Sequence, residues 1–468
     1  MKKEGNPVLY LVEALVVIAM LLLPMQSLLA APATIENFNS DFLEIAKATG
    51  VTIRQDGNAL IWEGPYAGKT KPQGPLAGKK VGVIVASEFS DMEAYYLASY
   101  LSEFGTDCHF LGVDWVLWKH TRPNVKTKGV QGLFGLSVDP VPTMGARHQY
   151  TPLREANPTE FDALIIPGGH SGDVMMTEGD VINFIKTAYE NGAIVGGIGG
   201  GIIPLIRAGI MNGKKATGDA VVDFMLERIG TLVDEPVVRD GDVITARGTI
   251  NTPEFVRELC RAFDPAFDDN KKDILKGKKI LIVAGEDFED IELAVPVLEY
   301  LYRGAELSLG TFPPPLRSRP PMLGLNNVIM GNFGMSVPLQ EIPGTAYKIV
   351  NLYEVNPKDY DVIQIPGAFC PWNMVVAGIP VEILKKFYDA GKIVAGICHA
   401  PIPIAKAGLL EGRKAAGWLA SQDAVSIMGG DYSWDYSAVI DGPVVTARVP
   451  DDLPEFLDAV TMAILSKE

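Results

Sequence analysis

Four segments of the chain recur at one constant distance along the sequence. The recurring pairs are KKVGVIVASEFSDME (79–93) with KKILIVAGEDFEDIE (278–292), GLSV (135–138) with GMSV (334–337), FDALIIPGG (161–169) with YDVIQIPGA (360–368), and GAIVGGIGGG (192–201) with GKIVAGICHA (391–400). The differences 278 − 79, 334 − 135, 360 − 161 and 391 − 192 all equal 199. Self-similarity at a fixed spacing indicates a repeated architecture, and 468 residues are too many for one ordinary domain. The sequence therefore predicts two copies of one domain, at 76–264 and 278–468.

Each copy alternates short apolar strands with amphipathic helices. In the first copy, strands are expected at 79–86, 161–169 and 193–198, and helices at 91–104, 179–190 and 202–209. This alternation predicts a largely parallel sheet covered by helices on both faces. Two copies side by side also predict a pseudo-twofold arrangement, an intramolecular counterpart of a C2 homodimer. Association beyond this pseudo-dimer stays open.

Three segments lie outside the two copies. Residues 1–33 contain Lys2 and Lys3, then an apolar run that ends in small residues, which is typical of a secretory signal peptide. The same run is long enough to be an uncleaved membrane anchor. Either way we expect the bulk of the chain to be exported, to the periplasm or the extracellular space. Residues 34–75 read as a small N-terminal segment and linker, with a hairpin turn at 56–58, and 265–277 as the linker between the copies.

Charge and cysteine content exclude some classes of partner. The net charge of −16 argues against a nucleic-acid partner, because phosphate binding needs clustered lysine and arginine. The four cysteines, at 108, 260, 370 and 398, have no metal-binding spacing, so we expect no metal site. A disulfide is permitted in an exported protein but is not required.

The second copy carries a pattern typical of a nucleophile. In GKIVAGICHAP (391–401) an apolar strand runs into a small-residue turn with Cys398, and Pro401 begins a helix. Such an elbow pushes the side chain out at the top of a sheet, and the helix start favours a thiolate. The alternative is a buried, inert cysteine.

Comparison of the two copies favours the nucleophile. At the offset of 199, Cys398 corresponds to Gly199 and His399 to Gly200, and Glu289 corresponds to Ser90. The first copy therefore lacks every side chain that we expect to do chemistry. We interpret it as a scaffold and the second copy as the active one. Glu289 could instead be one of several acids that stabilise a helix start, together with Asp290 and Glu292.

These motifs resemble the ThiJ/PfpI family of the class I glutamine-amidotransferase-like superfamily. The resemblance rests on FEDIEL (288–293), PGA (366–368), AGICHAP (395–401) and TARVPDDLPEF (446–456), and the first copy is similar in a degenerate form. It implies two tandem flavodoxin-like α/β sandwich domains. By this resemblance Cys398 is the nucleophile, Glu289 the carboxyl that hydrogen-bonds it, and His399 an acid/base or orienting group. The loop at Gly367 and Ala368 would form the oxyanion hole, although the family usually has glycine at the second position.

The resemblance suggests glyoxalase- or deglycase-like chemistry on reactive carbonyls. Cys398 would add to an α-oxoaldehyde, and Glu289 would move the proton between carbons to give a hydroxy acid. A cysteine hydrolase or peptidase would use the same thiolate, and a redox-sensing or chaperone-like protein is the non-enzymatic alternative. None of these needs a cofactor. Cys370 follows the PGA loop and could resolve an oxidised Cys398, or could be a small packed residue.

Overall fold

The structure is a computed structural model of the full chain. It describes residues 52–63, 74–116, 130–133, 137–138, 148–315, 328–332, 335–338 and 346–466. The predicted signal peptide or anchor at 1–33 lies outside these residues. Within the described ranges, the helices lack the combination of length and apolar character that crossing a membrane requires.

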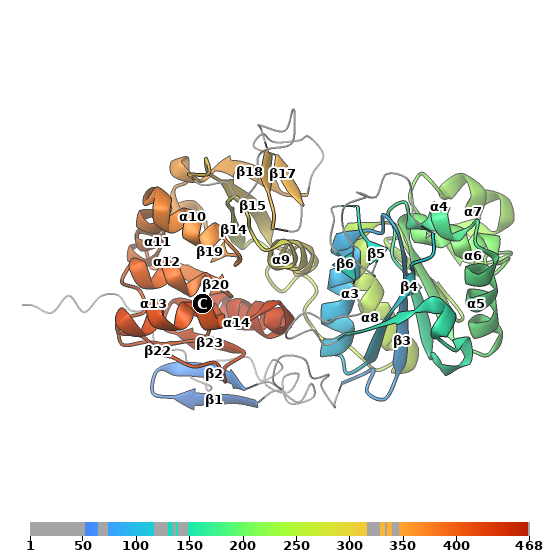
Figure 1. The fold of residues 1–468 in the computed structure, drawn as a ribbon, viewed down its shortest axis with the longest axis horizontal. Coiled ribbons are helices and arrows are strands. Elements are labelled where there is room, and N and C mark those ends of the chain that lie inside the picture. Colours follow the sequence, from blue (N-terminus) through green and yellow to red (C-terminus); the bar gives the residue numbers. More distant parts are fainter. Residues whose placement is uncertain are drawn as a thin grey trace, which may run out of the picture.

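The first copy forms a sheet of seven strands in the order β12-β13-β9-β8-β3-β4-β7. The strands are β3 (Lys80–Ala86), β4 (Asp107–Val113), β7 (Gln149–Pro152), β8 (Ala163–Ile166), β9 (Ile194–Ile198), β12 (Val237–Asp240) and β13 (Val243–Ala246). All pairs are parallel except β12 with β13. The helices are α3 (Asp91–Glu103), α4 (Ser171–Met175), α5 (Gly179–Glu190), α6 (Ile203–Arg207), α7 (Asp223–Ile229) and α8 (Thr252–Phe263). The expected α/β alternation is present (Figure 1).

The second copy repeats this arrangement and extends it to nine strands, in the order β1-β2-β23-β24-β20-β19-β14-β15-β18. Its own strands are β14 (Lys279–Ala284), β15 (Glu306–Thr311), β18 (Lys348–Asn351), β19 (Val362–Ile365), β20 (Ile393–Ile397), β23 (Ala438–Asp441) and β24 (Val444–Ala447). Its helices are α9 (Asp290–Tyr302), α10 (Cys370–Ala377), α11 (Ile379–Asp389), α12 (Pro401–Lys406), α13 (Gln422–Ile427) and α14 (Leu453–Leu465). Short two-stranded ladders in both copies come from β5 (Val130–Gln131), β6 (Ser137–Val138), β10 (Lys215–Ala216), β11 (Thr231–Leu232), β16 (Val328–Met330), β17 (Ser336–Pro338), β21 (Lys414–Ala415) and β22 (Asp431–Tyr432).

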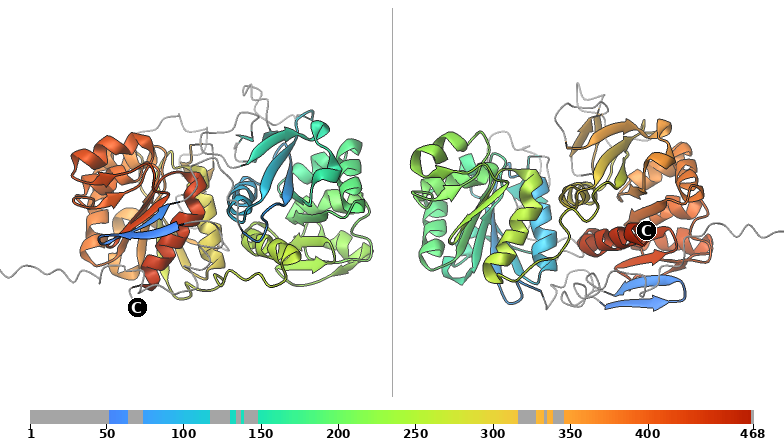
Figure 2. Two further views of the ribbon diagram at one scale, coloured as in Figure 1. Left: turned by 90° about the horizontal axis from the view of Figure 1, so that it is seen from below. Right: turned by 180° about the vertical axis from the view of Figure 1, so that it is seen from behind.

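The two extra strands come from the N-terminal segment. The expected hairpin is present as β1 (Thr52–Asp56) and β2 (Ala59–Glu63), and β2 pairs antiparallel with β23 of the second copy. Figures 1 and 2 show the hairpin in blue beside the red strands, although the first copy lies between them in the sequence. Leu60 and Trp62 are buried in the main core, and Ile61 packs on the opposite face of the sheet. The hairpin therefore closes an edge of a sheet that would otherwise expose backbone groups.

The two copies meet through corresponding helices. Helices α3 and α9, separated by 290 − 91 = 199 residues, pack against each other, as Figure 1 shows between the two sheets. One cluster of buried apolar residues runs from the first copy into the second across this contact. The packing of equivalent helices is the pseudo-twofold arrangement that the repeat predicts.

A buried ionic network crosses the same interface. Glu299 of α9 accepts from Arg257 Nη2 of α8 at 2.9 Å and from Arg303 Nε at 2.8 Å, and all three side chains are at most 1% exposed. The linker joins this network, because Asp269 pairs with Arg257 and Lys271 with Asp458 of α14. Segment 265–277 is thus packed into the interface rather than lying as a loose tether.

Candidate functional site

Cys398 occupies a sharp turn directly after β20. Its φ of +62° lies in the left-handed region that side chains other than glycine rarely adopt. The turn is held on both sides, because the N–H of Cys398 donates to the carbonyl of Ala447 at 3.0 Å and its own carbonyl accepts from the N–H of Trp418 at 2.8 Å. Helix α12 then begins at Pro401. The local geometry is that of a nucleophile elbow, in which strain at one residue presents its side chain at the sheet edge.

His399 lies against the cysteine. The distance from Cys398 Sγ to His399 Nδ1 is 3.3 Å, so adjacent residues do come within hydrogen-bonding reach on this turn. Burial lowers the pKa of His399 below its ordinary value, which favours the neutral imidazole near pH 7. A neutral ring can accept or donate a proton at the sulfur.

A buried carboxyl that the sequence analysis did not select, that of Glu292, lies beside the thiol, because a Cβ placed on Gly367 would be 2.7 Å from Glu292 Oε2 and 2.9 Å from Cys398 Sγ. The hydrogen bond expected between Glu289 and Cys398 stays a prediction. Glu292 is fully buried on the first turn of α9, and its Oε2 also accepts from the N–H of Gly367 at 2.5 Å. Its Oε1 has no hydrogen-bond partner among the described residues. Burial raises the pKa of Glu292 to about 8, although the bonds from Gly367 and Cys398 oppose that rise.

Glu289 is a second buried carboxyl beside the first. It is 7% exposed and precedes α9, and its Oε2 is also unpartnered within the described residues. Burial, followed by the nearby charges of Glu292 and Asp290, raises its pKa well above the usual range. Glu289 is near enough for its charge to raise the pKa of the Cys398 thiol. Its catalytic role stays a prediction.

The thiol itself does not have a lowered pKa. Burial raises the pKa of Cys398 well above its ordinary value, and the charges of Glu292 and Glu289 raise it further, while the N–H groups of Ala368 and His399 oppose the rise. The helix-start effect expected from the sequence is outweighed, because desolvation and two carboxyls act on the same atom. Burial therefore favours the protonated thiol, and the two neighbouring carboxyls act in the same direction.

The loop after β19 brings backbone donors to the sulfur. Ala368 pairs with Phe288 in a bridge and has a φ of +55°, and its counterpart Gly169 in the first copy has +79°. The alanine therefore keeps the left-handed shape that the family's glycine would give, at a cost of roughly 1–2 kcal/mol. The N–H of Ala368 faces Cys398, whereas that of Gly367 is engaged by Glu292. Position 367 also requires glycine, because a Cβ there would lie 2.5 Å from Cys398 Cβ.

The first copy keeps the frame of this site without its nucleophile. Gly199 has a φ of +49°, so the elbow persists. Glu93, the counterpart of Glu292 because 292 − 93 = 199, accepts from the N–H of Gly168 at 2.6 Å. Its other oxygen accepts from Thr249 Oγ1 at 2.7 Å, and burial raises its pKa to about 7.

The carboxyl is thus common to both copies, so side chains that differ between the copies do not reveal it. An acid that both copies share also indicates this site in the sequence. Glu93 ends FSDME (89–93), and Glu292 ends the corresponding FEDIE (288–292).

Cys370 is the first residue of α10 and is fully buried. It and the other three cysteines are free thiols in the structure. Burial raises the pKa of Cys370 to about 12, which makes it a weak partner for an oxidised Cys398.

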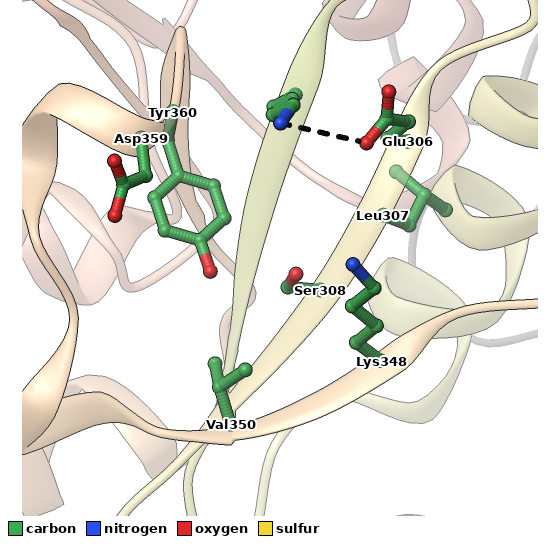
Figure 3. Close-up of a pocket in the computed structure, with 8 residues that line it drawn as sticks. Glu306, Leu307, Ser308, Lys348, Val350, Asp359 and Tyr360 are labelled. Atoms are coloured by element: carbon green, nitrogen blue, oxygen red, sulfur yellow. Dashed lines mark ion pairs between the residues drawn. The ribbon is translucent and has the colours of Figure 1, made fainter.

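A cavity of about 250 Å³ lies at the edge of the second sheet opposite to Cys398 (Figure 3). It is lined at the amino ends of the strands by Lys279, Glu306, Leu307, Ser308, Lys348, Val350, Asp359 and Tyr360. Cys398 lies at the carboxyl ends of the strands, where open α/β sheets bind ligands. In the first copy His109 stands in place of Ser308 (308 − 109 = 199), and its ring meets that of Phe161 edge-on.

Comparison with known protein families identifies the family of both copies. The model of the DJ-1/PfpI family matches twice, at residues 79–262 and 278–463. The chain belongs to the DJ-1/PfpI family. The two matches coincide with the two copies of the repeat, so this member carries two DJ-1/PfpI domains in one chain.

Relatives of this chain match different shares of it. Protein DJ-1 homolog D of Arabidopsis thaliana is 28% identical over 322 residues, which cover 66% of this chain and 79% of the relative. Deglycase PfpI of Pyrococcus furiosus is 31% identical over 175 residues, 37% of this chain and 92% of the relative. Among solved structures, a ThiJ/PfpI domain protein from Brachyspira murdochii matches with a TM-score of 0.32 and 20% identity, over 40% of this chain and 95% of its own.

Proposed function

We propose that the second copy is a cysteine-dependent enzyme that acts on reactive carbonyl compounds by thiolate addition. The observation that carries this proposal is the convergence on one sulfur atom of a protonatable carboxyl, an imidazole and two backbone N–H groups. Thiolate addition needs groups of these kinds. A base must take the thiol proton, and hydrogen-bond donors must stabilise the negative charge that develops on the carbonyl oxygen. The name deglycase among the relatives supports the same class of chemistry.

For a 2-oxoaldehyde the reaction begins with addition of the thiol to the aldehyde. The thiol proton passes to Glu292 or His399, the sulfur attacks the aldehyde carbon, and the carbonyl oxygen becomes an alkoxide facing the N–H groups of Ala368 and His399 before it is protonated. A carboxylate then removes the hydrogen from this carbon and returns a proton to the neighbouring ketone carbon, while the hydroxyl proton on the first carbon moves to the former ketone oxygen, which leaves a 2-hydroxyacyl thioester. Water cleaves the thioester to a 2-hydroxy acid and frees Cys398. The sum is 2-oxoaldehyde plus water to 2-hydroxy acid, without an external oxidant.

Glu292 is the carboxyl best suited to the proton transfers. It contacts the thiol, and a pKa of about 8 lets it exchange protons near neutral pH. Its free Oε1 leaves one oxygen available for substrate. Glu289 would remain protonated, so that it adds no second negative charge beside Glu292.

The decisive test compares methylglyoxal consumption by the wild type with that of Cys398→Ala and Cys398→Ser. Loss of at least a hundredfold in kcat/KM in both variants, with 2-hydroxy acid as product of the wild type, supports the proposal. Cys108→Ala is the matched control, because it removes a fully buried cysteine from the first copy. Equal rates in wild type and Cys398 variants would rule out a cysteine enzyme.

A cysteine hydrolase is the second candidate, and the contact of 3.3 Å between Cys398 Sγ and His399 Nδ1 favours it. Its signature would be turnover of esters or peptides, with no product from any aldehyde. Oxidation of Cys398 without turnover of either class would instead indicate redox sensing.

Export is likewise a proposal, supported by the charged and apolar pattern of residues 1–33. N-terminal sequencing of the protein recovered from its native host tests it, with cleavage expected within 30–33.

A further inference from the structure

An aromatic wall borders the candidate nucleophile on one side. Trp418 follows β21, and its ring lies 6.4 Å from that of His399 between centroids, tilted by 36°. Trp434 meets Trp418 edge-on, with 5.8 Å between ring centroids and an angle of 75°. Tyr432 is close enough for the charge of Cys398 to raise its pKa, after the larger effect of burial. These three side chains, Trp418, Tyr432 and Trp434, are called the aromatic wall below, and each is half-buried.

The backbone fixes the wall against the elbow. The N–H of Trp418 donates to the carbonyl of Cys398 at 2.8 Å, and Tyr432 donates from its hydroxyl to the carbonyl of Gly417 at 2.8 Å. A Cβ on Gly417 would lie 3.1 Å from the carbonyl of Cys398, so the two segments are in close contact. Trp434 is held by its carbonyl, which accepts from Arg448 Nη1 at 2.9 Å. These bonds fix the backbone of the wall beside the elbow.

The first copy shows that the fold does not require aromatic residues at these places. Trp418 corresponds to Asp219, because β10 and β21 are 414 − 215 = 199 residues apart. Trp434 corresponds to Asp234, because β11 and β22 are 431 − 231 = 200 residues apart. Asp219 still faces the elbow, with its Oδ2 2.9 Å from the place of a Cβ on Gly199. The copy that lacks a nucleophile thus has acids where the copy with Cys398 has tryptophans.

We propose that the aromatic wall selects 2-oxoaldehydes and related dicarbonyls with an aromatic or flat apolar substituent beside the reacting carbonyl. The inference rests on the proposed function and names its substrate class. A substrate held by its aldehyde carbon on Cys398 Sγ has its substituent within reach of His399 and the Trp418 ring. Stacking or edge contact with such rings contributes about 0.5–1.5 kcal/mol beyond the burial of area. Small substituents gain none of this.

The test measures kcat/KM for phenylglyoxal and methylglyoxal in the wild type, Trp418→Ala, Trp418→Asp and Trp434→Ala. We expect the wild type to prefer phenylglyoxal by about tenfold or more, and the Trp418 variants to lose about three- to tenfold of that preference through KM for phenylglyoxal. Trp115→Ala, a half-buried tryptophan of the first copy that packs under Arg154, is the matched control and should keep the preference. An unchanged preference in both Trp418 variants overturns the inference.

A binding experiment separates failure of the inference from failure of the proposed function. Calorimetry on Cys398→Ala with 1-phenyl-1,2-propanedione and 2,3-butanedione needs no turnover. Tighter binding of the phenyl compound, weakened severalfold by adding Trp418→Ala, supports the wall even if no aldehyde is consumed. Equal affinity for the two diketones overturns the wall even if methylglyoxal is consumed.

Discussion

At the scale of single residues, the two copies treat the same buried carboxyl differently. Glu93 has both oxygens occupied, one by Gly168 and the other by Thr249. The counterpart of Thr249 in the second copy is Pro450, since 450 − 249 = 201 follows from the two 3-10 turns that begin there. Proline offers no hydrogen-bond donor, and Oε1 of Glu292 has no hydrogen-bond partner among the described residues. The two copies thus differ in whether the second oxygen of this buried carboxyl is bonded.

We predict that Glu292→Gln lowers kcat for methylglyoxal by about 10²–10⁴-fold, the usual range for a lost acid–base group. The amide oxygen can still accept from Gly367, so the fold should persist, as circular dichroism can check. Glu289→Gln is the paired variant, and we expect a smaller loss. A larger loss in Glu289→Gln would assign the proton transfer to Glu289 instead.

The pKa of Glu93 predicts a pH dependence of stability. An acid whose pKa rises on folding, here from 4.5 to about 7, binds more protons in the folded state. Its contribution is therefore fully present below about 4.5 and is lost as the pH rises through about 7, which amounts to about 3 kcal/mol. Thermal melting at pH 5 and pH 8 should show a smaller difference in Glu93→Gln than in the wild type. The exposed Glu155→Gln is the control, and an identical difference in Glu93→Gln would contradict the assignment.

The elbow was predictable because its information is local and repeated. A strand, a small-residue turn and Pro401 lie within one stretch, and the first copy supplied Gly199 for comparison. Glu292 was not separable from Glu289 in the same way. Both are acids at a helix start, and only the direction in which the first turn of α9 presents each side chain distinguishes them. That direction depends on how the loop at Gly367 packs against the helix, which is a tertiary property.

At the scale of elements, the hairpin β1–β2 pairs with the second copy, although the first copy follows it in the sequence. Its turn at Gly57 was recognisable, yet nothing local indicates that β2 pairs with β23, several hundred residues away. The pairing is explained by burial. Leu60 and Trp62 alternate with Ala59 and Ile61, so both faces of β2 are apolar and both need cover. Only an edge of a sheet that is covered on both sides offers that, and β23 is such an edge.

We predict that Trp62→Ala destabilises the second copy rather than the first, by about 3–5 kcal/mol, the usual cost of removing a buried tryptophan. Hydrogen exchange should become faster in β23 and β24 and stay unchanged in β3 and β4. Thr52→Ala, an exposed residue of the same hairpin, should have no effect. Faster exchange confined to the first copy would show that the hairpin serves a different sheet.

At the scale of the whole molecule, the interface between the copies is no longer symmetric. Glu299 of α9 has Tyr100 as its counterpart in α3, because 299 − 100 = 199, and Arg257 of α8 has Asp458 in α14, because 458 − 257 = 201. Each copy therefore presents charges that the other copy complements and that a second identical copy would not. Such an interface favours pairing within one chain over pairing of like halves.

We predict that Glu299→Gln destabilises the interface by about 3–5 kcal/mol, because it leaves two buried guanidinium groups without their shared carboxylate. Differential scanning calorimetry should then resolve separate transitions for the two copies. Glu306→Gln, which alters an exposed pair with Lys279 at 3.7 Å, is the matched control with little expected effect. A single transition at the wild-type temperature in Glu299→Gln would contradict this role.

The strand β2 also has a topological consequence. The first copy is joined to the second at both of its ends, once through 265–277 and once through a strand donated to the other sheet. In terms of connectivity it is a domain inserted into a loop of its twin. Cutting the chain at 265–277 would yield two fragments that still share one β-sheet, in the manner of donor-strand complementation. A fragment that begins at residue 278 would instead lack β2 and leave β23 as an unpaired edge strand.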